Sequence, residues 1–420
     1  MKTILKTFVL ILALGMFHQG FAQKRDLDNY RLPDKRGINV FEAPKDTLTN
    51  FDGLQVRIGG ASTLQFQALD HSNASTGAPL AELESNFNLA TANLDLDVVI
   101  YDGLRMHLRT YLSSRHHPEP YVKGGYIQID KLEFIQEGFM EDLMKYVTVK
   151  FGHMENNYGD AHFRRSDNAQ AMYNPFIGNY LMDSFTTEVG GEVYYRRNGW
   201  IAMIGATNGK LNQSVVDVPT SPSVIAKVGF DKQLNEDLRT RLTASIYNTA
   251  QSANNFLYNG DRAGSRYYFV MENPEASSSG NFRSGRINPV LNKKLTAIMV
   301  NPFVKYKSFE FFGLFENSSG VTGGETERRT YNHYAAEAIY RFGSTENFYL
   351  GARYSYVDGE QPSGNNEEID RLQLGAGWFM TKNVLAKIEY VSQNYSGYEA
   401  GSILDDGNFD GISLEAVISF

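Results

Sequence analysis

The chain has 420 residues, no cysteine and a formal net charge of −8, with 25 tyrosines, 27 phenylalanines and 38 glycines. The lack of cysteine excludes disulfides, thiolate metal sites and cysteine nucleophiles, and the negative charge argues against a nucleic-acid partner, because neutralising phosphates needs a basic surface. Abundant strand-forming aromatic residues at a mildly negative mean hydropathy are typical of strands with one lipid-facing and one wet face.

The N-terminus has the pattern of a secretory signal peptide. Lys2 and Lys6 precede an apolar block, and small residues stand at Gly20 and Ala22, where a signal peptidase would cleave. We therefore expect residues 1–22 to be removed from the mature chain. No later run approaches the roughly 20 apolar residues that a membrane-spanning helix needs, so a membrane location would require a closed barrel.

Two further segments complete the expected organisation. Residues 23–52 are polar, carry two prolines and show no period, which predicts a periplasmic leader of irregular structure. Residues 53–420 alternate between apolar and polar side chains, which predicts one all-β domain, a 16-stranded antiparallel transmembrane β-barrel. Strands are expected at 54–69, 86–101, 104–109, 123–134, 145–156, 185–197, 199–208, 222–232, 238–250, 294–307, 309–317, 329–342, 347–358, 369–380, 383–395 and 411–420.

The connections between these strands alternate in length. Short links are expected at 102–103, 135–144, 198, 233–237, 308, 343–346 and 381–382, and long ones at 70–85, 110–122, 157–184, 209–221, 251–293, 318–328, 359–368 and 396–410. Long loops on one side and tight turns on the other, with both termini on the turn side, are typical of porins. Residues 266–271 remain an alternative extra strand.

The last strand carries the clearest membrane signal. Ile412, Leu414, Ala416 and Ile418 share one face with Phe420, and the chain stops on that apolar face. Aromatic residues also gather near the short links, as expected for a membrane-interface girdle: Tyr101, Tyr195, Trp200, Phe230, Tyr306, Phe309, Phe342, Phe348 and Trp378.

Charged side chains are predicted to face the lumen once each strand's apolar face is assigned to lipid. Twelve cations and seven carboxylates fall on the inner face, leaving a balance of about +5, and a positive lumen concentrates anions. The loop at 157–184 is placed to enter the lumen as a constriction, where Arg164 and Arg165 would bind phosphate-like or carboxylate solutes. The expected pore-lining or anion-binding residues are Arg57, Arg105, His107, Arg109, Lys150, Arg164, Arg165, Arg241, Arg353 and Arg371.

The common catalytic motifs are absent from the sequence. The sequence has no Gly-x-Ser-x-Gly, Walker loop or His-Glu-x-x-His pattern, so we expect no enzyme activity, no catalytic residue and no cofactor. His116-His117 is expected to be a solvated loop pair, although it has the residue types of a metal site, and calcium binding at Asp405-Asp406 stays an alternative.

Short pieces of the chain resemble one family of porins. The segment VTVKFGHMENNYGD, running on to FTTEVGGEVYY, the leader piece RGINVFEAPKD and the terminal Phe420 are similar to the phosphate-selective porin O and P family of Gram-negative outer membranes. The resemblance implies a 16-stranded, usually homotrimeric, anion-conducting channel in the outer membrane. The chain departs from the family pattern because its wall rows interleave carboxylates and it lacks a dense lysine cluster.

Together these observations favour an outer-membrane porin for passive diffusion of small hydrophilic solutes, with a modest preference for anions. Lipid, small solutes and copies of the same chain are the expected partners. Two rival functions stay open: a barrel plugged by its own loops that serves as a structural or partner-binding component, and a substrate-specific nutrient channel.

Overall fold

A computed structural model of the chain describes residues 31–45, 51, 53–113, 117–166, 170–209, 220–260, 264 and 266–420, with no side-chain description for 112–121. The expected signal peptide at 1–22, the first part of the leader and His116 lie outside the described residues. Within these ranges no helix is long and apolar enough to cross a membrane.

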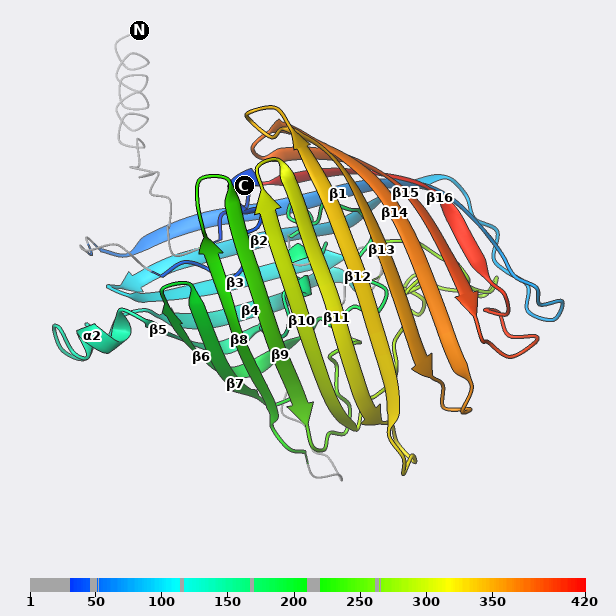
Figure 1. The fold of residues 1–420 in the computed structure, drawn as a ribbon, viewed down its shortest axis with the longest axis horizontal. Helices are drawn as coiled ribbons and strands as arrows, with labels where there is room; N and C mark the ends of the chain where they lie inside the picture. Colours follow the sequence, from blue (N-terminus) through cyan, green and yellow to red (C-terminus); the bar gives the residue numbers. More distant parts are fainter. Residues whose placement is uncertain are drawn as a thin grey trace, which may run out of the picture.

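Sixteen antiparallel strands form one closed barrel, in which each strand is hydrogen-bonded to its neighbours in sequence and β1 to β16 (Figure 1). This confirms the predicted fold. The strands are β1 (Gln55–Ser72), β2 (Asn86–Tyr101), β3 (Leu104–Ser113), β4 (His117–Ile129), β5 (Val147–Glu155), β6 (Thr187–Arg197), β7 (Trp200–Thr207), β8 (Ser223–Gln233), β9 (Leu238–Thr249), β10 (Lys294–Tyr306), β11 (Phe309–Val321), β12 (Arg329–Phe342), β13 (Phe348–Glu360), β14 (Asn366–Thr381), β15 (Val384–Ser396) and β16 (Asn408–Ser419).

Two connections differ from the sequence prediction. The predicted long loop at 110–122 is mostly strand, because β3 and β4 continue pairing through Tyr111 and Tyr121 up to Ser113 and His117. The chain after β4 instead makes a longer turn that holds the short helix α2 (Glu141–Met144). The region 266–271 is irregular and adds no strand.

The outer wall is apolar and lipid-facing. Along β16, Ile412, Leu414 and Ile418 are exposed while Ser413, Glu415 and Ser419 are buried, so the predicted alternation holds at this strand. The aromatic residues expected at the short-turn end also point outward; Trp200, for example, is 64% exposed and Trp378 52%. Such a girdle matches the membrane interface.

The barrel closes through the last residue of the chain. Phe420 exchanges two backbone hydrogen bonds with Gly60, at 3.0 and 2.9 Å, beyond the regular register that pairs Ala61 with Ser419. Gly59 and Gly60 leave room for this approach, because a Cβ on Gly59 would lie 2.9 Å from the Phe420 carbonyl oxygen. The terminal aromatic residue is therefore part of the seam.

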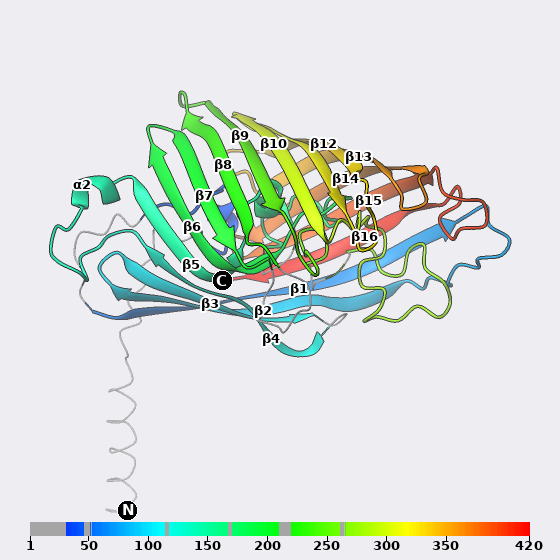
Figure 2. The ribbon, with the colours of Figure 1, turned by 90° about the horizontal axis from the view of Figure 1, so that it is seen from below.

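Loops and leader occupy the inside of the barrel. The loop between β5 and β6 (156–186) and the loop between β9 and β10 (250–293) both send buried side chains against the inner wall. Figure 2 shows long loops gathered at the end of the barrel opposite α2. Residues 31–45 of the leader, which we call the leader segment, also lie inside: Lys35 bonds to the β14–β15 turn, and Phe41 is only 3% exposed. The leader is irregular as expected, but this part is packed in the lumen.

Candidate functional site

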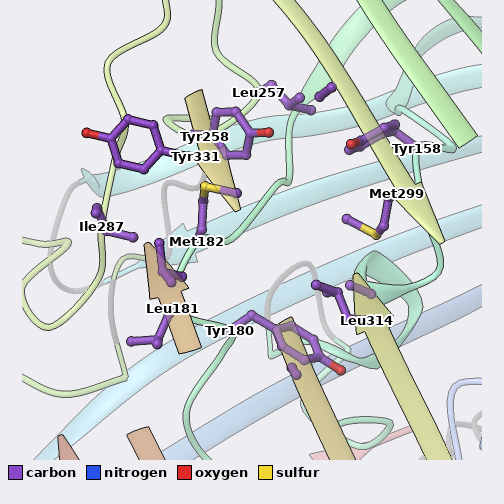
Figure 3. Packing of buried hydrophobic residues seen from close by; sticks show 14 of the residues in the cluster. Tyr158, Tyr180, Leu181, Met182, Leu257, Tyr258, Ile287, Met299, Leu314 and Tyr331 are labelled. Atoms are coloured by element: carbon purple, nitrogen blue, oxygen red, sulfur yellow. The ribbon is translucent and has the colours of Figure 1, made fainter. Parts of the chain in front are cut away.

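Apolar side chains from two loops and the wall fill part of the lumen. Figure 3 shows residues of the two loops pointing toward one another and toward the wall strands. We call this set the lumenal cluster; its labelled members are Tyr158, Tyr180, Leu181, Met182, Leu257, Tyr258, Ile287, Met299, Leu314 and Tyr331. All ten are buried, with exposed fractions of 6% or less. Close packing of this kind leaves little room for water, so the middle of the barrel is not an open, wet pore.

The predicted constriction loop does enter the lumen. Arg164 is 2% exposed and its Nη2 donates to Glu310 Oε1 at 2.8 Å and to Glu337 Oε2 at 2.9 Å. Nη1 also donates to Asn39 Oδ1 of the leader segment at 2.5 Å. Burial disfavours the charged guanidinium, but the two carboxylates outweigh it and raise the pKa of Arg164. Arg164 thus fastens the loop to β11 and β12.

The neighbouring Arg165 is used within the loop itself. Its guanidinium makes a two-pronged contact with Asp183, at 2.9 and 2.6 Å, and lies 3.9 Å from the centre of the Phe185 ring. Such fork-shaped pairs are geometrically specific. The dibasic pair therefore closes the loop on itself and on the wall, and its binding of anions stays a prediction.

A second cluster of buried charges joins the leader segment, the loop and β8–β9. Asp160 of the loop contacts Lys227 at 2.8 Å and Arg241 at 2.8 Å, and Glu42 of the leader segment contacts the same two cations at 3.2 and 2.8 Å. Burial favours the neutral acids, but the two cations outweigh it: the pKa of Asp160 falls to about 2 and that of Glu42 lies well below its usual value.

The predicted residues of β1 to β3 form a ladder of pairs along the inner wall. Arg57 and His107 both contact Asp97, at 2.5 and 2.8 Å, and Arg109 makes a fork-shaped contact with Asp95 at 2.7 and 2.8 Å. Strand pairing causes these contacts, because the register places Asp97 beside Arg57 and His107. Arg105, also buried, donates to Gln128 on β4 at 3.0 Å.

The arginines of β13 and β14 hold the far side of the β5–β6 loop. Arg353 contacts Glu337 at 2.6 Å and donates to the Gly178 carbonyl at 2.9 Å. Arg371 donates to Gln393 at 2.6 Å and to the Asn179 carbonyl at 2.7 Å, and also contacts the Gly285 carbonyl of the β9–β10 loop. Both arginines are 1% exposed or less, so they anchor loop backbone inside the barrel.

Glu316 and His333 show how the wall ties both loops together. Glu316 Oε1 accepts hydrogen bonds from Tyr158 of the first loop at 3.0 Å and from Tyr258 of the second at 2.9 Å. His333 lies beside it, with Nδ1 3.8 Å from Glu316 Oε2. One buried carboxylate on β11 thus positions two loops.

The charge balance of the lumen is lower than the sequence indicated. Glu310 and Glu316 of β11 are fully buried on the inner face and were not among the seven predicted inward carboxylates. Loop and leader add the carboxylates Glu42, Asp160 and Asp183 and the cations Arg164 and Arg165, and these charges pair with one another or with the wall. The expected surplus of about +5 on the wall is therefore largely compensated by local pairing.

A polar cavity of about 130 Å³ remains between β3–β6, the β5–β6 loop and the leader segment. Its lining includes three cations from the wall, Arg109, Lys123 and Lys150, and Arg31 from the leader segment, together with Glu42, Glu155 and Glu192. The Lys150 ammonium lies 5.4 and 5.3 Å from the ring centres of Tyr126 and Tyr194.

Of the ten predicted site residues, three therefore border this cavity, namely His107, Arg109 and Lys150. The other seven lie inside the barrel but serve as structural contacts to wall, loop or leader. Sequence reasoning missed Lys123 and Arg31 as lining residues. Lys123 was expected at the start of a strand but was not assigned to a face, and the leader was expected outside the barrel.

Acidic and imidazole groups do not gather into a metal site in the ranges that the structure covers. His162 lies in the short helix η2 (Ala161–Arg164), where its Nε2 is 3.1 Å from Asn157 Oδ1. Burial lowers the pKa of this histidine, although Glu155 opposes the shift.

Comparison with solved structures finds proteins of the same fold. An anion-selective porin from Comamonas acidovorans is similar with a TM-score of 0.54 at 12% identity, covering 87% of this chain and 100% of that one. The outer membrane channel DcaP of Acinetobacter baumannii gives 0.53 at 12%, covering 89% and 99%, and OmpT, an outer membrane protein of Vibrio cholerae, gives 0.53 at 11%, covering 89% and 100%. At this identity the likeness shows the fold.

No protein-family model matches the sequence, and no curated protein is significantly similar to it. The fold, the apolar outer wall and the aromatic rim together place the chain in the outer membrane of a Gram-negative cell.

Proposed function

We propose that this barrel is a narrow outer-membrane channel through which small hydrophilic solutes diffuse passively, with a modest preference for anions. The observation that carries the proposal is the polar cavity beside β3–β6, a part of the lumen where charged and hydrogen-bonding side chains border free space. Cations on low-dielectric walls raise the local anion concentration. Carboxylates and phosphate-like ions fit this chemistry, and we expect transport without catalysis.

The filled lumen limits what such a channel would pass. We infer that solutes pass on the β3–β6 side, where the polar cavity lies, because buried loop residues pack against the other wall strands. A narrow path favours small solutes and a small conductance. Membership of the phosphate-selective porin O and P family is part of the proposal. Most wall arginines have carboxylate or backbone partners. Homotrimeric assembly likewise belongs to the proposal, to be tested by the mass of the detergent complex.

The test is single-channel recording in planar bilayers with a salt gradient. We expect discrete current steps and a reversal potential whose sign indicates a preference for anions. Lys150→Gln should shift that potential toward zero, because it removes a cation from the cavity wall. Lys145→Gln is the matched control, since Lys145 lies in the turn outside the lumen, where it contacts Asp142 at 2.8 Å. A cation-selective wild type, or equal shifts in the two variants, would contradict the anion preference.

The packing of the lumenal cluster favours one competing function, a barrel plugged by its own loops that acts as a structural or partner-binding component. Such a barrel would show no current steps at any voltage while remaining folded by circular dichroism. A substrate-specific nutrient channel would instead conduct weakly and show current block that increases with the concentration of one solute.

A further inference from the structure

The leader segment forms the wall of the polar cavity that faces β3–β6. Arg31, Phe41, Glu42 and Ala43 all line this space, so the segment narrows the path from inside the barrel. Its anchor is Phe41, 3% exposed, whose ring lies 5.8 Å from Phe163 and 5.3 Å from Phe303 between ring centres. The width of the path therefore depends on where residues 31–45 lie.

The segment is held with little backbone pairing. Between the described leader residues and the wall, one backbone-to-backbone hydrogen bond is present, from Lys35 N to the Lys382 oxygen at 2.9 Å. Adjacent wall strands, by contrast, are paired over many consecutive residues. Side chains supply the remaining contacts, such as Arg31 over the Tyr173 ring at 3.5 Å. A segment joined in this way can separate without disrupting the sheet.

The wall groups that contact the segment keep partners without it. Lys227 and Arg241, which bind Glu42, are also paired with Asp160 at 2.8 Å. Arg239, which donates to the Asn39 carbonyl at 3.0 Å, also makes a fork-shaped pair with Asp231.

The same holds on the opposite wall. Glu310 accepts from Asn39 at 2.6 Å but is also contacted by Arg341 at 3.1 Å and by Arg164 at 2.8 Å. Breaking a buried ion pair is costly chiefly when one charge is left alone. Departure of the segment would leave each of these wall groups with at least one partner, with Lys227, Arg239 and Arg241 sharing Asp160 and Asp231, and Glu42 would enter water.

We propose that residues 31–45 are a detachable constriction of the lumen, in which Phe41 determines the width of the path and Glu42 opposes anion passage. This inference rests on the proposed channel function. It assigns the size limit of the path to the leader segment, in addition to the β5–β6 loop, and it makes the chain's own N-terminal region the element that widens or narrows the passage.

The first experiment measures single-channel current for Phe41→Ala and Glu42→Gln. Phe41→Ala should raise the conductance by about twofold or more, because it removes the aromatic anchor from the cavity wall. Glu42→Gln should move the reversal potential further toward anion preference. The matched control is Phe311→Ala. It removes a half-buried phenylalanine that lies on the outward-facing side of β11, away from the cavity.

The second experiment locks the segment reversibly. The hydrogen bond from Lys35 N to the Lys382 oxygen brings the two backbones together, and a disulfide can bridge residues whose Cα atoms lie about 4.4–6.8 Å apart. The natural chain has no cysteine, so Lys35→Cys with Lys382→Cys forms a single defined bond. We expect uniform small current steps when this bond is oxidised and larger or fluctuating steps after reduction, with the two single variants unaffected by reductant.

The outcomes separate the two proposals. If the wild type conducts but Phe41→Ala and the disulfide leave its current unchanged, the detachable constriction is wrong and the channel function stands. If the wild type, Phe41→Ala and a deletion of residues 31–45 all insert as folded barrels and none conducts, the channel function is wrong and this inference falls with it.

Discussion

Replacing Arg164 by glutamine should release the β5–β6 loop from the wall. Arg164 is 2% exposed and joins Glu310, Glu337 and Asn39. Removing one partner of a buried ion pair costs about 3–5 kcal/mol. Glu310 keeps Arg341, and Glu337 keeps Arg353 at 2.6 Å, so neither carboxylate is left alone.

We therefore expect a cost of about 3 kcal/mol, the lower end of the range for breaking a buried pair. Because about 1.4 kcal/mol corresponds to a factor of ten in an equilibrium constant, the undocked population of the loop should rise roughly 100-fold.

The assay for this change is thiol labelling at Ala171→Cys, a small loop residue that is 3% exposed. The chain contains no other cysteine, and labelling of a transiently exposed site follows its open population when opening and closing are fast. Arg328→Gln, at an arginine that contacts Ser319 on the exposed surface, is the control. A rise of less than about threefold, which corresponds to less than about 0.7 kcal/mol, together with a changed reversal potential, would refute the clamp and support Arg164 as an anion site.

Three further predictions follow from single residues. Asp160 has a folded pKa of about 2 because Arg241 and Lys227 outweigh the effect of burial. Its stabilising contribution should be complete above the unfolded pKa of about 3.9 and should disappear as the pH falls through about 2. Thermal unfolding between pH 2 and 7 measures this dependence, which should be absent in Asp160→Asn. Tyr258→Phe removes one of the two tyrosine hydrogen bonds to Glu316 and should cost about 1–3 kcal/mol in denaturant unfolding, since a buried acceptor loses a partner; an unchanged midpoint would exclude this bond as a stabilising contact. Deleting Phe420 should reduce the yield of heat-modifiable barrel, because its two backbone bonds to Gly60 are lost, whereas Phe420→Tyr should assemble normally; equal yields would refute the role of the terminal residue.

The barrel wall could be predicted because strand alternation is a local property. Each strand meets lipid on one face, so the period of two is written directly in segments such as 411–420. The assignment of strand faces from sequence is least certain in strands that carry apolar residues on both faces. On β11, Phe309 and Phe311 face outward while Phe312 and Leu314 face inward beside Glu310 and Glu316, so hydrophobicity alone does not assign this strand's faces.

The lumen could not be predicted in the same way, because its contents come from segments distant in sequence. Tyr158 and Tyr258 share Glu316 although they are 100 residues apart in the numbering. One signal was available: both long loops contain apolar runs, Tyr180-Leu181-Met182 and Phe256-Leu257-Tyr258, that a solvated loop would not need. The arginines were correctly placed inside the barrel, but their partners decide whether they attract solutes or fasten loops.

The seam between β1 and β16 bears on how this protein is made. Phe409 of β16 lies 5.4 Å from the Tyr267 ring of the second loop, and both it and Leu69 of β1 belong to the same buried set as the loop residues. Until the final strand arrives, that aromatic interior stays exposed on one side. Biogenesis thus couples two events, because the pairing of β16 with β1 closes the barrel and also removes the lumenal aromatic side chains from water. An arrested assembly intermediate would therefore expose apolar surface to periplasmic chaperones and proteases.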